Sequence, residues 1–278
     1  MKVSQAAEIW MNYHQVQSKR NTVRAYRTVI TKFCGEFGDS DLGRLTPDDV
    51  LSFLNRWTQN SKPQTKRIRY AYLSSFFNFV RDNLDSGFIS PCDSPLFKKL
   101  YKSQVTTSWE MIEKETVDEI IFRTTKVRNR LMLELMVRGG MRVGEVLKLT
   151  ANDIQGRKLI LRDPKSGKER EYVFIPQKTA ERLKDYAKSV CENPEARVFQ
   201  ISYEAARILV AKAGRLVGIK LKPHDLRRHA ATYASRAGVP IEIVSMVILC
   251  HANLATTQRN LRKICNIEAI RWIENLYA

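Results

Sequence analysis

Two stretches near the end of the chain combine side chains that could bind and transform a phosphate. The first is Lys222-Pro223-His224-Asp225-Leu226-Arg227-Arg228-His229, and the second runs from Leu249 to Asn260. Pro223 favours a helix start because its φ angle is fixed and it has no N–H to leave unpaired. His224 and Arg227 then lie three residues apart on one face of the first turn. A guanidinium can hold phosphate oxygens while an imidazole transfers a proton, so this pair indicates phosphodiester chemistry or phosphate binding.

A His-x-x-Arg pair can also occur by chance on a helix surface, and the charge of the whole chain helps to decide. Its 278 residues have a formal net charge of +18 and a pI near 9.8. Such an excess indicates a polyanionic partner, for which nucleic acid is the first candidate. An anionic membrane surface is the alternative, but the basic residues are dispersed along the chain and form no single basic amphipathic helix.

The sequence contains no sign of export, membrane insertion or metal binding. No stretch approaches the roughly 20 apolar residues of a membrane span, and the first residues lack the apolar core of a signal peptide. The five cysteines are widely spaced and include no C-x-x-C pair, which is typical of reduced thiols. We therefore expect a cytoplasmic, nucleoid-associated protein with no cofactor and no metal.

The first hundred residues have the pattern of a helical domain with a basic surface. Apolar residues recur at helical spacing over 3–17 and 22–37, and Pro47 and Pro63 each start a further helix. Cations crowd the first two turns of the helix that follows Pro63, namely Lys62, Lys66, Arg67 and Arg69. Cations at a helix start are mildly unfavourable to the helix dipole, which favours a DNA contact over a merely solvated face. Arg24, on the second helix, could extend the same surface.

Residues 86–108 are expected to be an interdomain linker. They contain Gly87, Pro91, Pro95 and several serines and threonines, without sustained periodicity. The predicted domains are therefore 1–85 and 109–278, which could close around a duplex as a clamp. A single compact domain is the alternative.

The second domain is expected to be mixed α/β. A nearly continuous apolar run over 127–137 predicts a buried helix, and Arg142 follows it at a glycine-containing turn. A guanidinium in that place needs a partner, either Glu145 or an external anion. The runs 158–162 and 171–176 predict a β-hairpin with Lys165 and Lys168 at its tip. Further helices are expected over 178–190, 202–217, 224–237, from Pro240 through Ile248, and over 268–276.

These elements together resemble the tyrosine site-specific recombinases, the phage integrase and Xer-like family. The resemblance rests on Arg142 in Met-Arg-Val-Gly-Glu, Lys165 on a hairpin, His224-x-x-Arg227, and His251 followed by Ala-Thr-Thr-Gln. It covers nearly the whole length, and the order and spacing of five elements behind a helical basic domain make it specific. It implies a mainly α fold with a small β-hairpin or sheet, in which a helical core-binding domain precedes a mixed α/β catalytic domain.

The resemblance also implies catalytic roles and partners. In the family two arginines clamp the scissile phosphate of double-stranded DNA, a role that falls on Arg142 and Arg227. The lysine, Lys165, protonates the leaving 5′ oxygen, His224 assists proton transfer and His251 completes the pocket. A tyrosine forms a 3′-phosphotyrosine link, so neither metal nor cofactor is needed. The family acts as a tetramer on DNA, in which the C-terminal helix, 268–276, usually docks on a neighbouring protomer. We also expect DNA contacts from Lys168 and Arg228.

One departure from the family pattern concerns the nucleophile. The tyrosine should lie nine residues after His251, where this sequence has Asn260, and an amide cannot form a stable phosphoester intermediate. Cys250 also replaces the usual glycine before the histidine, and Arg262 stands where a small residue is common. Tyr277 could serve as the nucleophile in trans, although its position beside Leu276 fits better with packing of the last helix.

Two interpretations of function follow. In the first, the chain is a recombinase that belongs to DNA integration or recombination but cannot cleave in this form. In the second, it is a non-catalytic DNA-binding relative that occupies sites or regulates an active enzyme. A basic ribosomal or RNA-binding protein would not require the five elements in this order.

Overall fold

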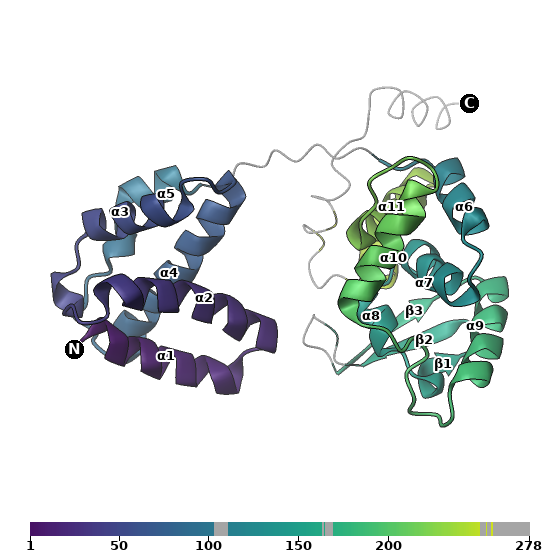
Figure 1. The fold of residues 1–278 in the computed structure, drawn as a ribbon, viewed down its shortest axis with the longest axis horizontal. Helices are drawn as coiled ribbons and strands as arrows, with labels where there is room; N and C mark the ends of the chain where they lie inside the picture. Colours follow the sequence, from purple (N-terminus) through teal and green to yellow (C-terminus); the bar gives the residue numbers. More distant parts are fainter. Residues whose placement is uncertain (103–110, 163, 165–168, 251–253, 255–256, 258–278) are drawn as a thin grey trace. The chain divides into compact units, whose positions relative to one another are not determined.

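The computed structural model describes residues 1–102, 111–162, 164, 169–250, 254 and 257 (Figure 1). The chain divides into two compact units, Met1–Ser108 and Trp109–Ala278. The fold is mainly helical with one small antiparallel sheet, which confirms the predicted fold class. Within the described residues, no helix combines the length and the apolar character needed to cross a membrane.

The first unit, over its described residues 1–102, is built of helices. Its elements are α1 (Val3–Gln17), α2 (Arg20–Phe37), the 3₁₀ turn η1 (Leu42–Arg44), α3 (Pro47–Thr58), α4 (Pro63–Asn83), the 3₁₀ turn η2 (Pro91–Asp93) and α5 (Pro95–Leu100). Proline occupies the first position of α3, α4 and α5, where a missing N–H costs no hydrogen bond. Thr46 and Asp49 add a reciprocal capping box to α3. The core is rich in aromatic rings, including Trp10, Phe33 and Phe76.

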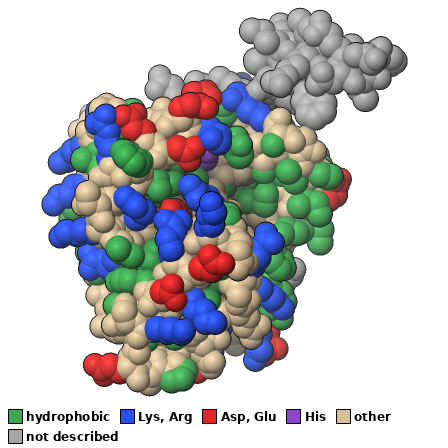
Figure 2. All heavy atoms as spheres, turned by 90° about the vertical axis from the view of Figure 1, so that its right-hand side faces the viewer, with side chains coloured by type: hydrophobic (Ala, Val, Ile, Leu, Met, Phe, Trp, Pro, Cys, Tyr) green, Lys and Arg blue, Asp and Glu red, His purple; other side chains and the backbone are tan. Residues whose placement is uncertain are grey.

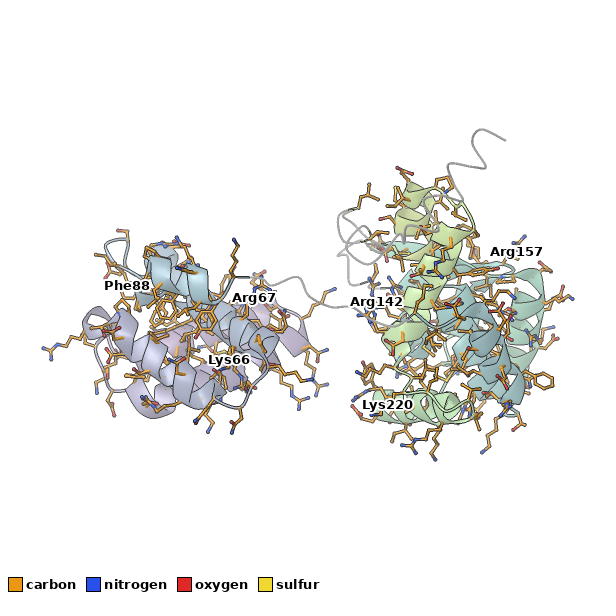
Figure 3. All side chains as sticks on the ribbon, turned by 90° about the horizontal axis from the view of Figure 1, so that it is seen from above. Lys66, Arg67, Phe88, Arg142, Arg157 and Lys220 are labelled. Carbon is orange, nitrogen blue, oxygen red and sulfur yellow. The ribbon has the colours of Figure 1, made fainter. Side chains whose placement is uncertain are left out.

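Residues 86–102, part of the predicted linker, lie within the first unit and contribute to its core. Phe88, Cys92 and Phe97 are buried in the core of that unit, and Figure 3 labels Phe88 among its side chains. The Tyr70 ring stacks on Phe97 and its hydroxyl donates to the Cys92 carbonyl oxygen at 3.1 Å. Glycine, proline and serine gave the segment the composition of a linker, but its apolar side chains supply the buried contacts.

The second unit arranges helices around a three-stranded sheet. Its elements are α6 (Lys114–Arg123), α7 (Val127–Arg138), α8 (Val143–Lys148), the 3₁₀ turn η3 (Ala151–Asp153), β1 (Ile154–Gln155), β2 (Lys158–Arg162), β3 (Arg170–Phe174), α9 (Gln177–Val190), α10 (Tyr203–Arg215), α11 (Pro223–Arg236), α12 (Ile241–Ile243) and the π-helix η4 (Val244–Ile248). The strands are antiparallel in the order β1-β2-β3.

Helix α7 is the centre of this second core. It contacts α6, α8, α9 and α11, as its continuous apolar sequence predicts. Its buried Glu134 accepts hydrogen bonds from Arg182 Nη2 at 2.7 Å and Thr179 Oγ1 at 3.2 Å, both on α9. A buried carboxylate of this kind is tolerated because both a charge and a hydroxyl satisfy it.

The segment from Pro240 to Ile248 differs from the single helix that was predicted. Only Ile241–Ile243 is α-helical, and Val244–Ile248 widens into a π-helix. The predicted helix over 268–276 lies outside the described residues. Short π segments occur often at functional sites, and this one leads directly to Cys250.

Candidate phosphate-binding site

Arg142 lies at the sharp turn between α7 and α8. Gly140 has a φ angle of +63°, and a Cβ atom added there would lie 2.5 Å from the Ile248 carbonyl oxygen. Only glycine lets the turn and η4 approach this closely. Arg142 is the N-cap of α8, and its backbone N–H donates to Glu145 Oε2 at 2.7 Å. Its guanidinium donates to Glu145 Oε1 at 2.5 Å. Of the two partners considered for Arg142, the structure therefore contains Glu145.

Arg227, on α11, is the buried member of the site. The residue is 3% exposed, and its two terminal nitrogens donate to the carbonyl oxygens of Gly140 and Leu249. Nη1 also lies 3.8 Å from Glu145 Oε2. Burial, together with the charge of Arg142, lowers the pKa of Arg227 to about 10, although Glu145 opposes the shift. The guanidinium therefore remains charged at neutral pH.

Glu145 joins the two arginines. One carboxylate oxygen accepts from Arg142 while the other faces Arg227. The two guanidiniums are thereby held near each other, although their charges repel. A phosphate that met both would find its donors already positioned, and this is the arrangement that stabilises a developing charge most effectively.

His224 joins this arginine pair from the first turn of α11. His224 is partly exposed to solvent, and burial of the rest of the ring disfavours the charged form and lowers the pKa of His224. Arg228, Arg227 and Arg142 also lower it, while Asp225 raises it. Arg228 is half-buried and lies 3.5 Å from Asp225, and burial lowers the pKa of Arg228. The neutral imidazole can accept a proton where the two guanidiniums converge.

Two further side chains near Arg227 were not among the predicted site residues. Glu171, on β3, is 7% exposed, and its Oε2 accepts no hydrogen bond from the described part of the chain. Cys250 has a φ angle of +43°, and its Sγ lies 3.6 Å from the Tyr172 carbonyl oxygen. Burial, followed by Glu171, raises the pKa of Cys250 to about 11. Strand alternation could have placed Glu171 inside, because it shares a face with the apolar Val173 and Ile175.

The structure thus brings together three of the predicted catalytic residues, Arg142, His224 and Arg227. Four other predicted positions lie outside the described residues: Lys165, Lys168, His251 and Asn260. Within the described ranges, no three His, Cys, Asp or Glu side chains gather closely enough to hold a metal ion.

The basic residues predicted in the first unit have different surroundings. Lys62 and Arg24 are exposed, whereas Lys66 and Arg67 are half-buried at the start of α4 (Figure 3). Arg24 lines a hollow of about 660 Å³ together with Arg20 and Arg27. Arg69 instead packs its guanidinium 4.1 Å from the centre of the Trp57 ring and donates to the Trp57 carbonyl oxygen at 3.0 Å. That side chain closes the end of α3.

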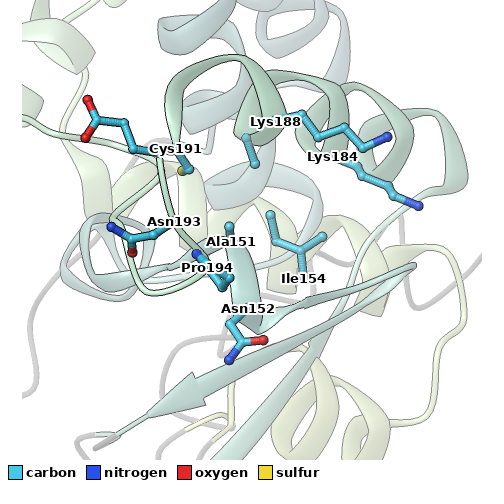
Figure 4. A pocket seen from close by; sticks show the side chains of 10 residues that line it. Ala151, Asn152, Ile154, Lys184, Lys188, Cys191, Asn193 and Pro194 are labelled. Carbon is cyan, nitrogen blue, oxygen red and sulfur yellow. The ribbon is translucent and has the colours of Figure 1, made fainter.

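The second unit also has a hollow. It is separate from the arginine cluster, by which we mean Arg142, Arg227, Glu145 and His224. It has a volume of about 460 Å³ and lies between the C-terminal end of α9 and the η3–β1 segment (Figure 4). Its lining includes Ile154, Lys184, Lys188 and Cys191. None of Arg142, His224 and Arg227 lines this hollow. Elsewhere, lysine and arginine side chains are spread over the face seen in Figure 2, with some acidic side chains among them.

Comparison with known proteins identifies the family. Residues 98–263 match the model of the phage integrase family. The tyrosine recombinase XerA of Pyrococcus horikoshii is 30% identical over 267 residues, which cover 92% of this chain and 88% of the relative. Among solved structures, the Tn1549 transposon integrase in complex with transposon right end DNA has a TM-score of 0.76 at 14% identity, with 100% of both chains covered. A lambda integrase dimer bound to a core site has a TM-score of 0.74 at 16% identity, with 94% of this chain and 95% of that chain covered.

The structural similarities support the integrase type of fold. The sequence match shows, in addition, which family the chain belongs to. The family model covers more than half of the chain, and it spans the turn of Arg142 as well as helix α11. This chain therefore belongs to the phage integrase family.

Proposed function

We propose that the protein is a site-specific recombinase or integrase of the tyrosine type that acts on double-stranded DNA. The observation that carries the proposal is the Glu145 carboxylate, which holds the guanidinium of Arg142 at 2.5 Å and faces that of Arg227 at 3.8 Å. His224 lies close enough for both arginines to lower its pKa. Such a preorganised set of donors is suited to the charge of a phosphorane. The relatives named above, a tyrosine recombinase and two DNA-bound integrases, support the same partner.

In the proposed reaction, Arg142 and Arg227 bind the scissile phosphate and His224 accepts or returns a proton. Lys165 protonates the 5′ oxygen as its bond to phosphorus breaks, and His251 completes the pocket. The attacking group would be a tyrosine at position 260, whose oxygen bonds to phosphorus while the 5′ oxygen leaves. Asn260 cannot supply that oxygen, so the protein is proposed to bind and hold DNA without cleaving it.

The two units have separate proposed roles. The first, with Arg24, Lys62, Lys66 and Arg67 on its surface, would contact the duplex as a core-binding domain, and the second would carry the chemistry. Lys168 and Arg228 would add phosphate contacts. Pairs of sites would be held in a tetramer through the segment 268–276, in the cytoplasm and on the nucleoid.

A second candidate function is that of a non-catalytic DNA-binding protein, which occupies sites or regulates an active relative. Cys250 favours it, because a side chain at a φ angle of +43° is strained where the family resemblance expects glycine. Together with Asn260, this residue indicates relaxed requirements on the catalytic geometry.

Trapping of a covalent complex on suicide DNA substrates separates the two candidates. We expect the Asn260→Tyr variant to become covalently linked to DNA, whereas the unaltered protein does not. An Asn260→Phe variant is the matched control, since it adds the ring without the hydroxyl. If both the unaltered protein and the control become linked, Tyr277 or another residue is the nucleophile. If none of the three becomes linked while all bind, the non-catalytic function is favoured.

A further inference from the structure

The outer face of the small sheet combines aromatic and basic side chains. In the β2–β3 pairing, Lys158 lies opposite Phe174, Ile160 opposite Tyr172, and Arg162 opposite Arg170. Directly paired residues of an antiparallel sheet project to the same side. The alternate residues, Leu159, Leu161 and Val173, are buried in the core. The outward side therefore presents two aromatic rings, one aliphatic side chain and three cations.

The two rings are open to solvent in the structure. Tyr172 is 43% exposed and Phe174 is 52% exposed. They are two residues apart on β3, which separates them by about 7 Å along the strand. Lys158 places its ammonium 3.8 Å from the centre of the Tyr172 ring, so a cation already lies beside this aromatic surface.

The cations of this face retain capacity for a phosphate. Arg162 donates to Asp153 at 2.7 Å and to Glu195 at 3.3 Å, and Arg170 lies 3.9 Å from Glu169. About half or more of each arginine side chain is exposed nonetheless. A partner with flat apolar groups and a regular series of negative charges would match the whole face.

Unpaired nucleotides have this combination of properties. Bases stack on exposed aromatic rings while basic side chains follow the backbone. In a duplex strand the bases are about 3.4 Å apart and their faces are already stacked. Two rings about 7 Å apart therefore suit bases of an extended single strand better than those of a duplex.

We propose that the outer face of the β2–β3 sheet binds single-stranded DNA, with unpaired bases stacked on Tyr172 and Phe174 and phosphates near Lys158 and Arg170. None of Arg142, His224 and Arg227 belongs to this surface. It goes beyond the proposed recombinase function and can be tested apart from it.

Fluorescence anisotropy with one short oligonucleotide, as a single strand and as the matching duplex, tests the proposal. For the double variant Tyr172→Ser, Phe174→Ser of the full chain we expect single-strand affinity to fall by roughly tenfold or more. Duplex affinity, which rests on phosphate contacts, is expected to change by less than about twofold. The matched control is Tyr203→Ser, which removes an exposed tyrosine from α10 and should leave both affinities unchanged.

The pair Tyr172→Leu, Phe174→Leu distinguishes stacking from apolar contact and serves if the serine variant fails to fold. It keeps apolar area but removes the rings, so the single-strand affinity should still fall. Unchanged single-strand affinity in the leucine variant would overturn the proposal, as would an equal loss on the duplex. A change in self-association with unaltered DNA binding would assign the face to a second copy of the chain and would also overturn it.

Discussion

Arg69 in the first unit and Arg227 in the second unit are chemically similar but have different surroundings. Each donates to backbone carbonyl oxygens, Arg69 to Trp57 and Arg227 to Gly140 and Leu249. Arg69 also lies against an aromatic ring and donates to Ser61 at 3.3 Å. Arg227 lies beside Arg142, Glu145 and His224. A guanidinium acts on an anion where other cations converge with it, and the same side chain alone stabilises the end of a helix.

The largest effect should come from removing the buried member of this pair. Arg227→Ala leaves two buried carbonyl groups without donors and Glu145 with one cation fewer, so we expect a loss of roughly 3–5 kcal/mol in the free energy of unfolding. Arg69→Ala is the comparison, with an expected loss of about 1 kcal/mol. Denaturant unfolding followed by circular dichroism measures both, and equal losses would contradict the distinction between the two sites.

The next effect separates DNA contacts from structural cations in the first unit. If Lys66 and Arg67 each neutralise a phosphate, the double variant Lys66→Ala, Arg67→Ala should reduce the slope of log affinity against log salt by roughly 2, at about 0.9 per contact. Arg69→Ala should leave the slope unchanged while it lowers stability. Duplex binding measured over a series of salt concentrations provides both slopes. A slope that depends on Arg69 but not on Lys66 and Arg67 would reverse the assignment.

The contrast also explains what could be predicted from the sequence. Apolar periodicity and prolines at helix starts located most of the described helices, because these signals are local, but they missed α5 in the predicted linker. Glu145 was one of the two partners considered for Arg142, because it lies nearby in the sequence. The bond from Arg227 to Gly140 joins residues far apart in sequence, and no spacing rule contains it. Phe88 and Phe97 lie in a segment with the composition of a linker, so their burial could be recognised only from the folded unit.

A smaller effect concerns the backbone beside the arginine cluster. Cys250 has a φ angle of +43°, a conformation that costs a non-glycine residue roughly 1–2 kcal/mol. Part of the gain from glycine is offset by its greater flexibility in the unfolded chain. We expect Cys250→Gly to raise the free energy of unfolding by roughly 0.5–1 kcal/mol. Cys250→Ala, which keeps a Cβ, should not. Thermal unfolding of the two variants side by side tests this, and equal stabilities would show that strain at this residue is negligible.

The smallest effect compares one histidine from each unit. Burial lowers the pKa of both His14 and His224, so both rings should titrate below the ordinary value of about 6.5. Because the unfolded rings bind protons at higher pH than the folded ones, the stability linked to each histidine is present above about pH 6.5 and is lost as pH falls.

A phosphate at Arg142 and Arg227 would favour the charged imidazole and raise the pKa of His224. His14 packs against Trp10 and Tyr26 and is hydrogen-bonded to Ser18. Its pKa should not change when the phosphate binds. NMR titration with and without duplex DNA measures both, and a shift at His14 alone would place the bound phosphate away from the arginine cluster.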